Sequence, residues 1–105
     1  MILEIADIRV QPEQADAFAQ AIQRALTEVM ARATGARGWT VHRCQESPGR
    51  FILQIDWATL EDHTVGFRQG PLFAQWRAII GPFFAQPPLV EHFDAVTAHG
   101  SLARA

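Results

Sequence analysis

Four histidines are available for acid-base chemistry in this chain, and two of them lie among apolar residues of the sequence. His63 precedes Phe67 by four residues, a spacing that places both side chains on the buried face of a short helix. His92 lies in the middle of the last apolar segment. Most buried histidines are satisfied by a backbone carbonyl, so the residues alone favour a structural role for His63 over a catalytic one.

The remaining polar chemistry is restricted by what the composition lacks. The sequence contains no Lys, Tyr or Asn, which excludes a lysine Schiff base, a tyrosine acid and an asparagine oxyanion donor. Cys44 is the only cysteine, which we expect in the core, and it cannot form an internal disulfide or a cysteine cluster. No histidine pair has the spacing of metal ligands on a helix, and no glycine-rich nucleotide motif is present. We therefore expect no metal, haem, flavin or other cofactor.

Aromatic and arginine side chains gather in the second half of the chain. Their density exceeds what two short helices need for a core, so a cavity for a flat apolar ligand can form between these helices and a sheet. Arg68 ends the first helical segment and Arg77 follows Trp76 in the next, although both are also explained as ordinary surface arginines. The aromatic residues of this region are Trp57, Phe67, Phe73, Trp76, Phe83 and Phe84.

A β-α-β-β-α-β order of elements is predicted to position these side chains. This order is the split βαβ pattern of the ferredoxin-like fold, an α+β class in which both helices cover one face of a four-stranded sheet. We expect His42 on the second strand. The predicted elements are a strand over residues 2–10, a helix from 12 to about 34, strands over 38–44 and 51–57, helical segments over 59–68 and 71–80, and a strand over 89–96.

The second face of the predicted sheet is not hydrophilic enough for a monomer. Both sides of the strands over 51–57 and 89–96 carry apolar residues. An exposed face of this kind exceeds the few hundred Å² of apolar patch that soluble monomers tolerate. We therefore expect a homodimer in which two sheets pack face to face and close a dimeric α+β barrel.

Length and charge limit the remaining possibilities. The 105 residues suffice for one core, so we expect one domain over residues 1–96 and a tail over 97–105 that contains a solvated His99. A net charge of -2 gives no basic patch for nucleic acid or an anionic membrane. The sequence has no apolar run of the roughly 20 residues that span a bilayer, and its first residues lack the basic region and cleavage site of a leader peptide, so we expect a cytoplasmic location.

The segment from Trp57 to Phe84, WATLEDHTVGFRQGPLFAQWRAIIGPFF, followed by PPLVEHFD, resembles the antibiotic biosynthesis monooxygenase family of small dimeric α+β barrels. With the first strand and the long helix, the resemblance covers residues 1 to 96. The family includes cofactor-independent oxygenases of quinol and anthrone-type phenols, haem-degrading members, and members without known activity. Haem degraders use an Asn, Trp and His set, where this chain has Asp7, Gly66 and Trp76, which disfavours haem degradation.

The resemblance to the oxygenases implies a mechanism without a cofactor. A base removes a phenolic proton, the anion passes an electron to O₂, and the radical pair recombines in a closed apolar cavity. The resemblance makes His63 the base, with His92 as a second candidate, and Arg68 the residue that stabilises the anion. It also implies a pocket for a small aromatic molecule, lined by Trp57, Phe67, Phe73 and Trp76.

Two other classes of function stay open. The same barrel can be a non-catalytic ligand-binding or stress-responsive module, in which the histidines are structural. It can also be a cofactor-free isomerase or a mutarotase-like enzyme, which would favour a polar pocket with paired carboxylates.

Overall fold

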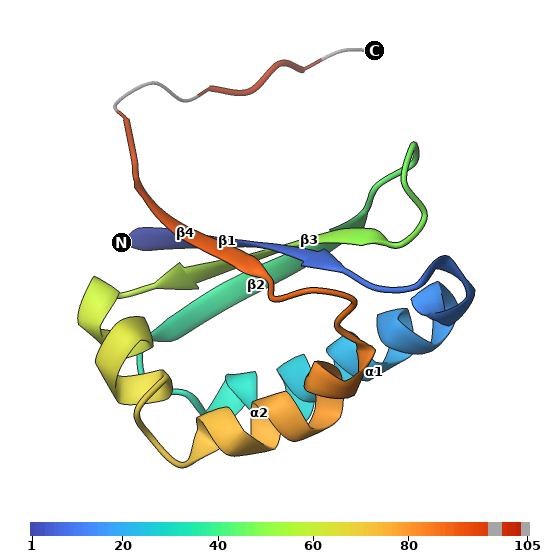
Figure 1. Cartoon of the computed structure of the whole chain (residues 1–105). Coiled ribbons are helices and arrows are strands. Elements are labelled where there is room, and N and C mark those ends of the chain that lie inside the picture. Colours follow the sequence, from blue (N-terminus) through green and yellow to red (C-terminus); the bar gives the residue numbers. More distant parts are fainter. Residues whose placement is uncertain (97–99, 104–105) are drawn as a thin grey trace.

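A four-stranded antiparallel sheet carries both main helices on one of its faces (Figure 1). The computed structural model describes residues 1–96 and 100–103. The strand order is β2-β3-β1-β4, which confirms the predicted α+β, ferredoxin-like topology. The elements are β1 (Ile2–Arg9), α1 (Ala15–Glu28), β2 (Ala36–Arg43), β3 (Arg50–Trp57), α2 (Leu72–Ile80) and β4 (Leu89–Asp94).

Short helical turns connect these elements and change two predicted boundaries. The helix predicted from residue 12 to about 34 consists of η1 (Pro12–Gln14), α1 and η2 (Met30–Arg32). Gly35, with a φ of 85°, forms the tight connection into β2. The last strand ends at Asp94 rather than Val96, because its pairing with β1 ends where Asp94 meets Ile2 and β1 offers no further partner.

The core lies between the sheet and the helices. Alternate residues of β3, namely Phe51, Leu53, Ile55 and Trp57, face the helices and are buried. The amphipathic α1 packs Phe18 and Ile22 into the same core. On β1 the inward positions are Glu4, Ala6 and Ile8, so one carboxylate stands in a row of apolar side chains. Burial of a charged side chain is costly, which marks Glu4 as an exception in this core.

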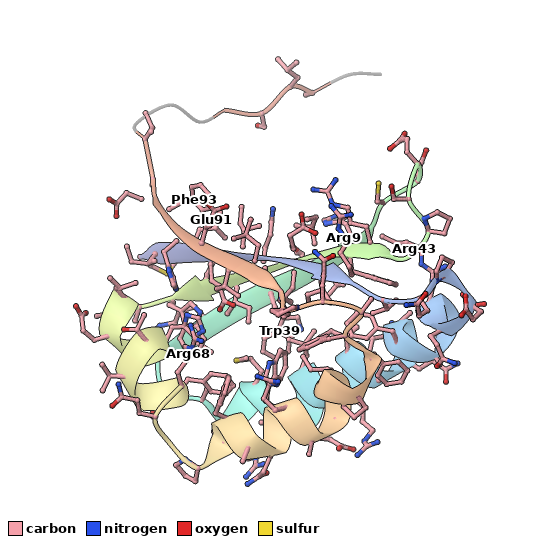
Figure 2. All side chains as sticks on the ribbon, viewed as in Figure 1. Arg9, Trp39, Arg43, Arg68, Glu91 and Phe93 are labelled. Carbon is pink, nitrogen blue, oxygen red and sulfur yellow. The ribbon has the colours of Figure 1, made fainter. Side chains whose placement is uncertain are left out.

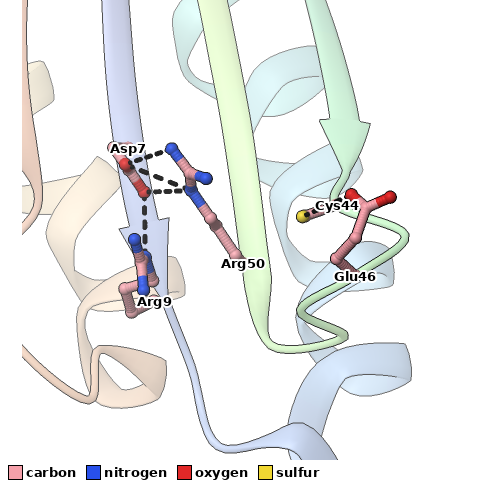
Figure 3. A network of polar contacts seen from close by, with 5 residues as sticks. All are labelled: Asp7, Arg9, Cys44, Glu46 and Arg50. Atoms are coloured by element: carbon pink, nitrogen blue, oxygen red, sulfur yellow. Dashed lines mark hydrogen bonds and ion pairs between the residues drawn. The ribbon is translucent and has the colours of Figure 1, made fainter.

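The opposite face of the sheet mixes ion pairs with apolar residues. Arg50 donates from Nη2 to Asp7 Oδ2 at 2.9 Å, and Arg9 donates from Nε to Asp7 Oδ1 at 3.1 Å (Figure 3). The hydrogen bonds from Arg50 hold the pKa of Asp7 below its usual value. Phe93 of β4 projects from this face and is 42% exposed (Figure 2). The predicted apolar character of the open face is therefore present on β4.

Three smaller findings complete the fold. Cys44 is half-buried beside Glu46 after β2, so the prediction of a core cysteine is wrong (Figure 3).

Residues 97–99, which include His99, and residues 104–105 lie outside the described residues. None of the described helices is long and apolar enough to cross a membrane.

Candidate functional site

A π-helical turn, η3 (Asp62–Phe67), brings two predicted site residues into the interior. Thr59 Oγ1 accepts a hydrogen bond from the Asp62 N–H at 3.1 Å, which confirms the predicted helix start. The Arg68 N–H then donates to the His63 carbonyl at 3.0 Å, five residues back. His63 and Phe67 are both buried, as the helical spacing predicts. Such turns are often found at functional sites.

His63 is the centre of a buried chain of polar groups. Its Nε2 lies 3.4 Å from Glu4 Oε1, and its Nδ1 lies 2.7 Å from His92 Nε2. The indole of Trp57 donates a hydrogen bond from Nε1 to the same Glu4 oxygen at 2.8 Å. The His63 ring stacks on the Trp57 indole with 4.9 Å between ring centroids. Both nitrogens of His63 therefore face protein groups that can exchange a proton with it.

The four polar groups come from three strands and η3, and the register of the sheet brings their side chains together. Glu4 of β1 is paired with His92 of β4, so the two side chains lie on the same face of the sheet. Trp57 is the last residue of β3 and is paired with Ile2. His63 then enters from η3 over these strands, which completes the order Trp57, Glu4, His63, His92.

Burial changes the acidity of both central groups, in opposite directions. Desolvation raises the pKa of Glu4 to about 6, against the effects of the Trp57 hydrogen bond and the charge of Arg68. Desolvation, with the charges of His92 and Arg68, lowers the pKa of His63 to about 4. At neutral pH, Glu4 is mainly a carboxylate and His63 is a neutral imidazole. A neutral His63 can donate from Nε2 to Glu4 and accept at Nδ1 from His92.

A cavity of about 200 Å³ lies next to these polar groups, between the sheet and α2. Glu4 and His63 line it together with mainly apolar side chains, among them Ile8, Leu53 and Ile80. Oxygen Oε2 of Glu4 has no hydrogen-bond partner among the described residues. Because no fully buried side-chain oxygen of these residues lacks a partner, Oε2 keeps some accessible surface, and Glu4 lines the cavity. The cavity thus presents a carboxylate oxygen to an apolar ligand.

The structure brings together most of the predicted site residues. The predicted residues that line the cavity are His63, Phe67, Arg68, Phe73 and Trp76. Trp57 is fully buried and does not line the cavity, because its place at the inner face of β3 puts it behind Glu4 and His63. His92 contacts His63 without lining the cavity. His42 lies on β2, on the face away from the helices.

Glu4 is the site residue that the sequence analysis missed. A signal for it exists, because Glu4 shares the two-residue period of the inward-facing Ala6 and Ile8. A carboxylate at an inward position of a strand must have a partner or a function. No group of three or more potential ligands among residues 1–96 and 100–103 could hold a metal ion.

Comparison with known proteins identifies the family and agrees with the fold. Residues 1–79 match the antibiotic biosynthesis monooxygenase family. The uncharacterized protein YczJ of Bacillus subtilis is 31% identical over 99 residues, which cover 91% of this chain and all of that protein. The crystal structure of a proposed antibiotic biosynthesis monooxygenase from Bordetella bronchiseptica is 42% identical, with a TM-score of 0.84 over 90% of this chain and 96% of that one. A similarly described protein from Nitrosomonas europaea shares the fold at 19% identity, with a TM-score of 0.74 over 91% and 99% of the two chains.

Proposed function

The chain belongs to the antibiotic biosynthesis monooxygenase family, and we propose that it oxidises a phenolic or quinol-type aromatic substrate with O₂ and without a cofactor. The observation that carries this proposal is the Glu4 carboxylate, which is buried, linked to two histidines and open to an apolar cavity. Such a site can remove a proton from a phenol and hold the resulting anion among mainly apolar side chains.

Glu4 is the better proton acceptor of the two groups at the cavity. A phenol with a pKa of about 10 exceeds the pKa of Glu4, about 6, by roughly 4 units, or about 5 kcal/mol. The gap to His63, with a pKa of about 4, is roughly 6 units, or about 8 kcal/mol. The Arg68 guanidinium, which also lines the cavity, can offset part of this difference by stabilising the phenolate. We therefore assign proton abstraction to Glu4 and not to His63.

His63 holds the Glu4 carboxyl in place, since its Nε2–H can donate to Glu4 while its Nδ1 accepts from His92. The contacts of 3.4 Å and 2.7 Å connect Glu4 through His63 to His92, which is only partly buried. The phenolate gives one electron to O₂, the radical pair forms a carbon–oxygen bond, and the resulting peroxide takes the proton back from Glu4 to become a hydroperoxide. Loss of water from the hydroperoxide leaves a ring carbonyl, so one oxygen atom enters the product and the other leaves as water.

The test is oxygen consumption by the purified protein with 1,4-dihydroxynaphthalene and 1-naphthol. We expect turnover to rise with pH through the pKa of Glu4, about 6, because only the carboxylate accepts the proton. A chelator should leave the rate unchanged. If the protein binds these phenols but consumes no oxygen above the uncatalysed rate at any pH, the oxygenase proposal is wrong.

The mainly apolar lining of the cavity also suits a second candidate, a ligand-binding module without catalysis. In that case the polar chain is structural, and binding occurs without oxygen consumption. An isomerase has less support, because Glu4 is the single carboxylate among the described residues that line the cavity.

We further propose that two copies of the chain pack through their open sheet faces. Members of this family are commonly dimeric. Leu89 and Phe93 of β4 are 61% and 42% exposed on this face, where a partner sheet would cover them. An interface of at least about 2,000 Å² is expected. Sedimentation at micromolar concentration should show a dimer that Phe93→Asp weakens, whereas a folded wild-type monomer would contradict the proposal.

A further inference from the structure

Two arginines of the cavity wall hold their charges against aromatic rings. The guanidinium carbons of Arg68 and Arg77 lie 5.8 and 5.9 Å from the centre of the Phe73 ring, and that of Arg77 lies 5.6 Å from Phe84. All four residues line the cavity. Figure 2 places Arg68 between η3 and the sheet. A cation–π contact fixes the position of a guanidinium but leaves its N–H donors available.

These donors have no acceptor within the described part of the chain. Arg9, Arg24, Arg43 and Arg50 are each paired with a carboxylate, and Arg32 donates to a backbone carbonyl and to Gln75. The side chains of Arg68 and Arg77, two residues that are exposed to solvent, make no hydrogen bond or ion pair with the described residues. Arg37 also makes none, but it lies on β2 and does not line the cavity.

The charge of the cavity wall is therefore unbalanced. Two guanidinium groups face one carboxylate, Glu4, and the charge of Arg68 acts on both Glu4 and His63. Arg68 is thus the cation closest to the proton-accepting end, where it can stabilise a phenolate. Arg77 remains as a second, planar, bidentate donor that suits a carboxylate.

The size of the cavity limits the ring system. Pockets for drug-sized ligands measure about 300–1,000 Å³, whereas an apolar cavity of about 150 Å³ can hold benzene. The cavity in this chain, about 200 Å³, suits one or two rings and is small for the three rings of an anthrone.

We propose that the ligand is a one- or two-ring aromatic acid whose carboxylate is bound by Arg77, with its phenolic oxygen placed between Glu4 and Arg68. The placement of the phenol rests on the proposed oxygenase function, whereas recognition of the carboxylate follows from the arginines alone. Arg77 therefore determines which phenols enter the site.

Calorimetric binding of two stable probes tests the role of the carboxylate. We expect wild type to bind 1-hydroxy-2-naphthoate at least about 10-fold more tightly than 1-naphthol, since a hydrogen bond to a charged group contributes about 1.5–3 kcal/mol. Arg77→Gln should abolish this preference by weakening the binding of the acid and leaving that of 1-naphthol unchanged. Arg77→Lys, which retains the charge, should retain part of the preference. The matched control, Arg37→Gln, should behave as wild type.

Three results would overturn the inference. They are equal affinity of wild type for both probes, no measurable binding of the acid at millimolar concentration, and an Arg77→Gln variant that is folded by circular dichroism and keeps the full preference. The size limit predicts that 2-naphthoate binds at least about 10-fold more tightly than anthracene-2-carboxylate. Equal affinities for these two acids would refute the size limit.

The binding experiments need no turnover, so they separate the two proposals. A preference for the acid without oxygen consumption would refute the oxygenase proposal and support recognition of the carboxylate. Oxygen consumption with equal binding of the acid and the neutral phenol would support the oxygenase proposal and refute recognition of the carboxylate.

Discussion

Glu4 and Asp7 are two carboxylates three residues apart on the same strand, and the sheet separates them completely. Glu4 faces the helices, where burial raises its pKa to about 6. Asp7 faces the other side, where the Arg50 guanidinium lowers its pKa. The comparison teaches that the face of the sheet, and not the type of residue, decides the role of each group.

The partners of the two carboxylates explain this difference. Asp7 accepts hydrogen bonds from two arginines, which neutralise its charge (Figure 3). Glu4 accepts from Trp57 and lies beside His63, both of which are uncharged at neutral pH. The charge of Asp7 therefore stabilises the fold. The charge of Glu4 lowers the stability of the fold, because it is poorly solvated, and it remains available to accept a proton.

The largest expected effect of this difference is on turnover. Glu4→Gln keeps the size of the side chain but removes the base, so kcat should fall by about 10²- to 10⁴-fold. Asp7→Asn, the matched change on the other face, should leave kcat per folded dimer within a few-fold of wild type. Oxygen consumption at equal folded concentration measures both. Similar losses of kcat in the two variants would show that the different positions of Glu4 and Asp7 do not matter for catalysis.

A smaller effect of the opposite sign is expected on stability. Because the pKa of Glu4 is raised from 4.5 to about 6, the folded state binds this proton more tightly than the unfolded chain does. Stability from this group is full below pH 4.5 and is lost as the pH rises through about 6, at a cost of about 2 kcal/mol. Glu4→Gln should therefore unfold at higher denaturant concentration than wild type at pH 8. Its advantage should shrink at pH 5, and a Glu4→Gln variant that is less stable at pH 8 would contradict this account.

The smallest effect concerns Asp7, and its dependence on pH is reversed. A lowered pKa means that the stability from Asp7 is present above its unfolded value of 3.8 and is lost as the pH falls through the folded value. The pairs with Arg9 and Arg50 are partly exposed, so Asp7→Asn should cost about 0.5–1 kcal/mol at pH 7. Urea unfolding at pH 7 and pH 3 measures this. A cost that grows toward pH 3 would show that the charge of Asp7 does not stabilise the protein.

The parts of the site that depend on local periodicity could be predicted from the sequence. The spacing of His63 and Phe67 indicated one buried helical face, and both side chains are inside. The turn residues and alternating strands likewise indicated the ferredoxin-like order, because these signals depend on neighbours along the chain.

Contacts between distant segments could not be predicted in the same way. The contact of His63 with His92 requires that β4 lie beside β1 in the register that pairs Glu4 with His92. A single sequence does not specify this register. Trp57 was expected in the pocket for a similar reason, since its type indicated an aromatic wall and only its position behind Glu4 excludes it.

The π-helical turn has a consequence for how this site can be inherited. A ring closed over five residues, from the Arg68 N–H to the His63 carbonyl, contains one residue more than an α-helical ring. Deletion of one codon between these positions would replace the wide ring by an α-helical one and so change where His63 meets Glu4 and His92. Homologous genes that lack this codon should therefore lack the histidine pair as well, so a one-residue gap in an alignment would separate the two lineages.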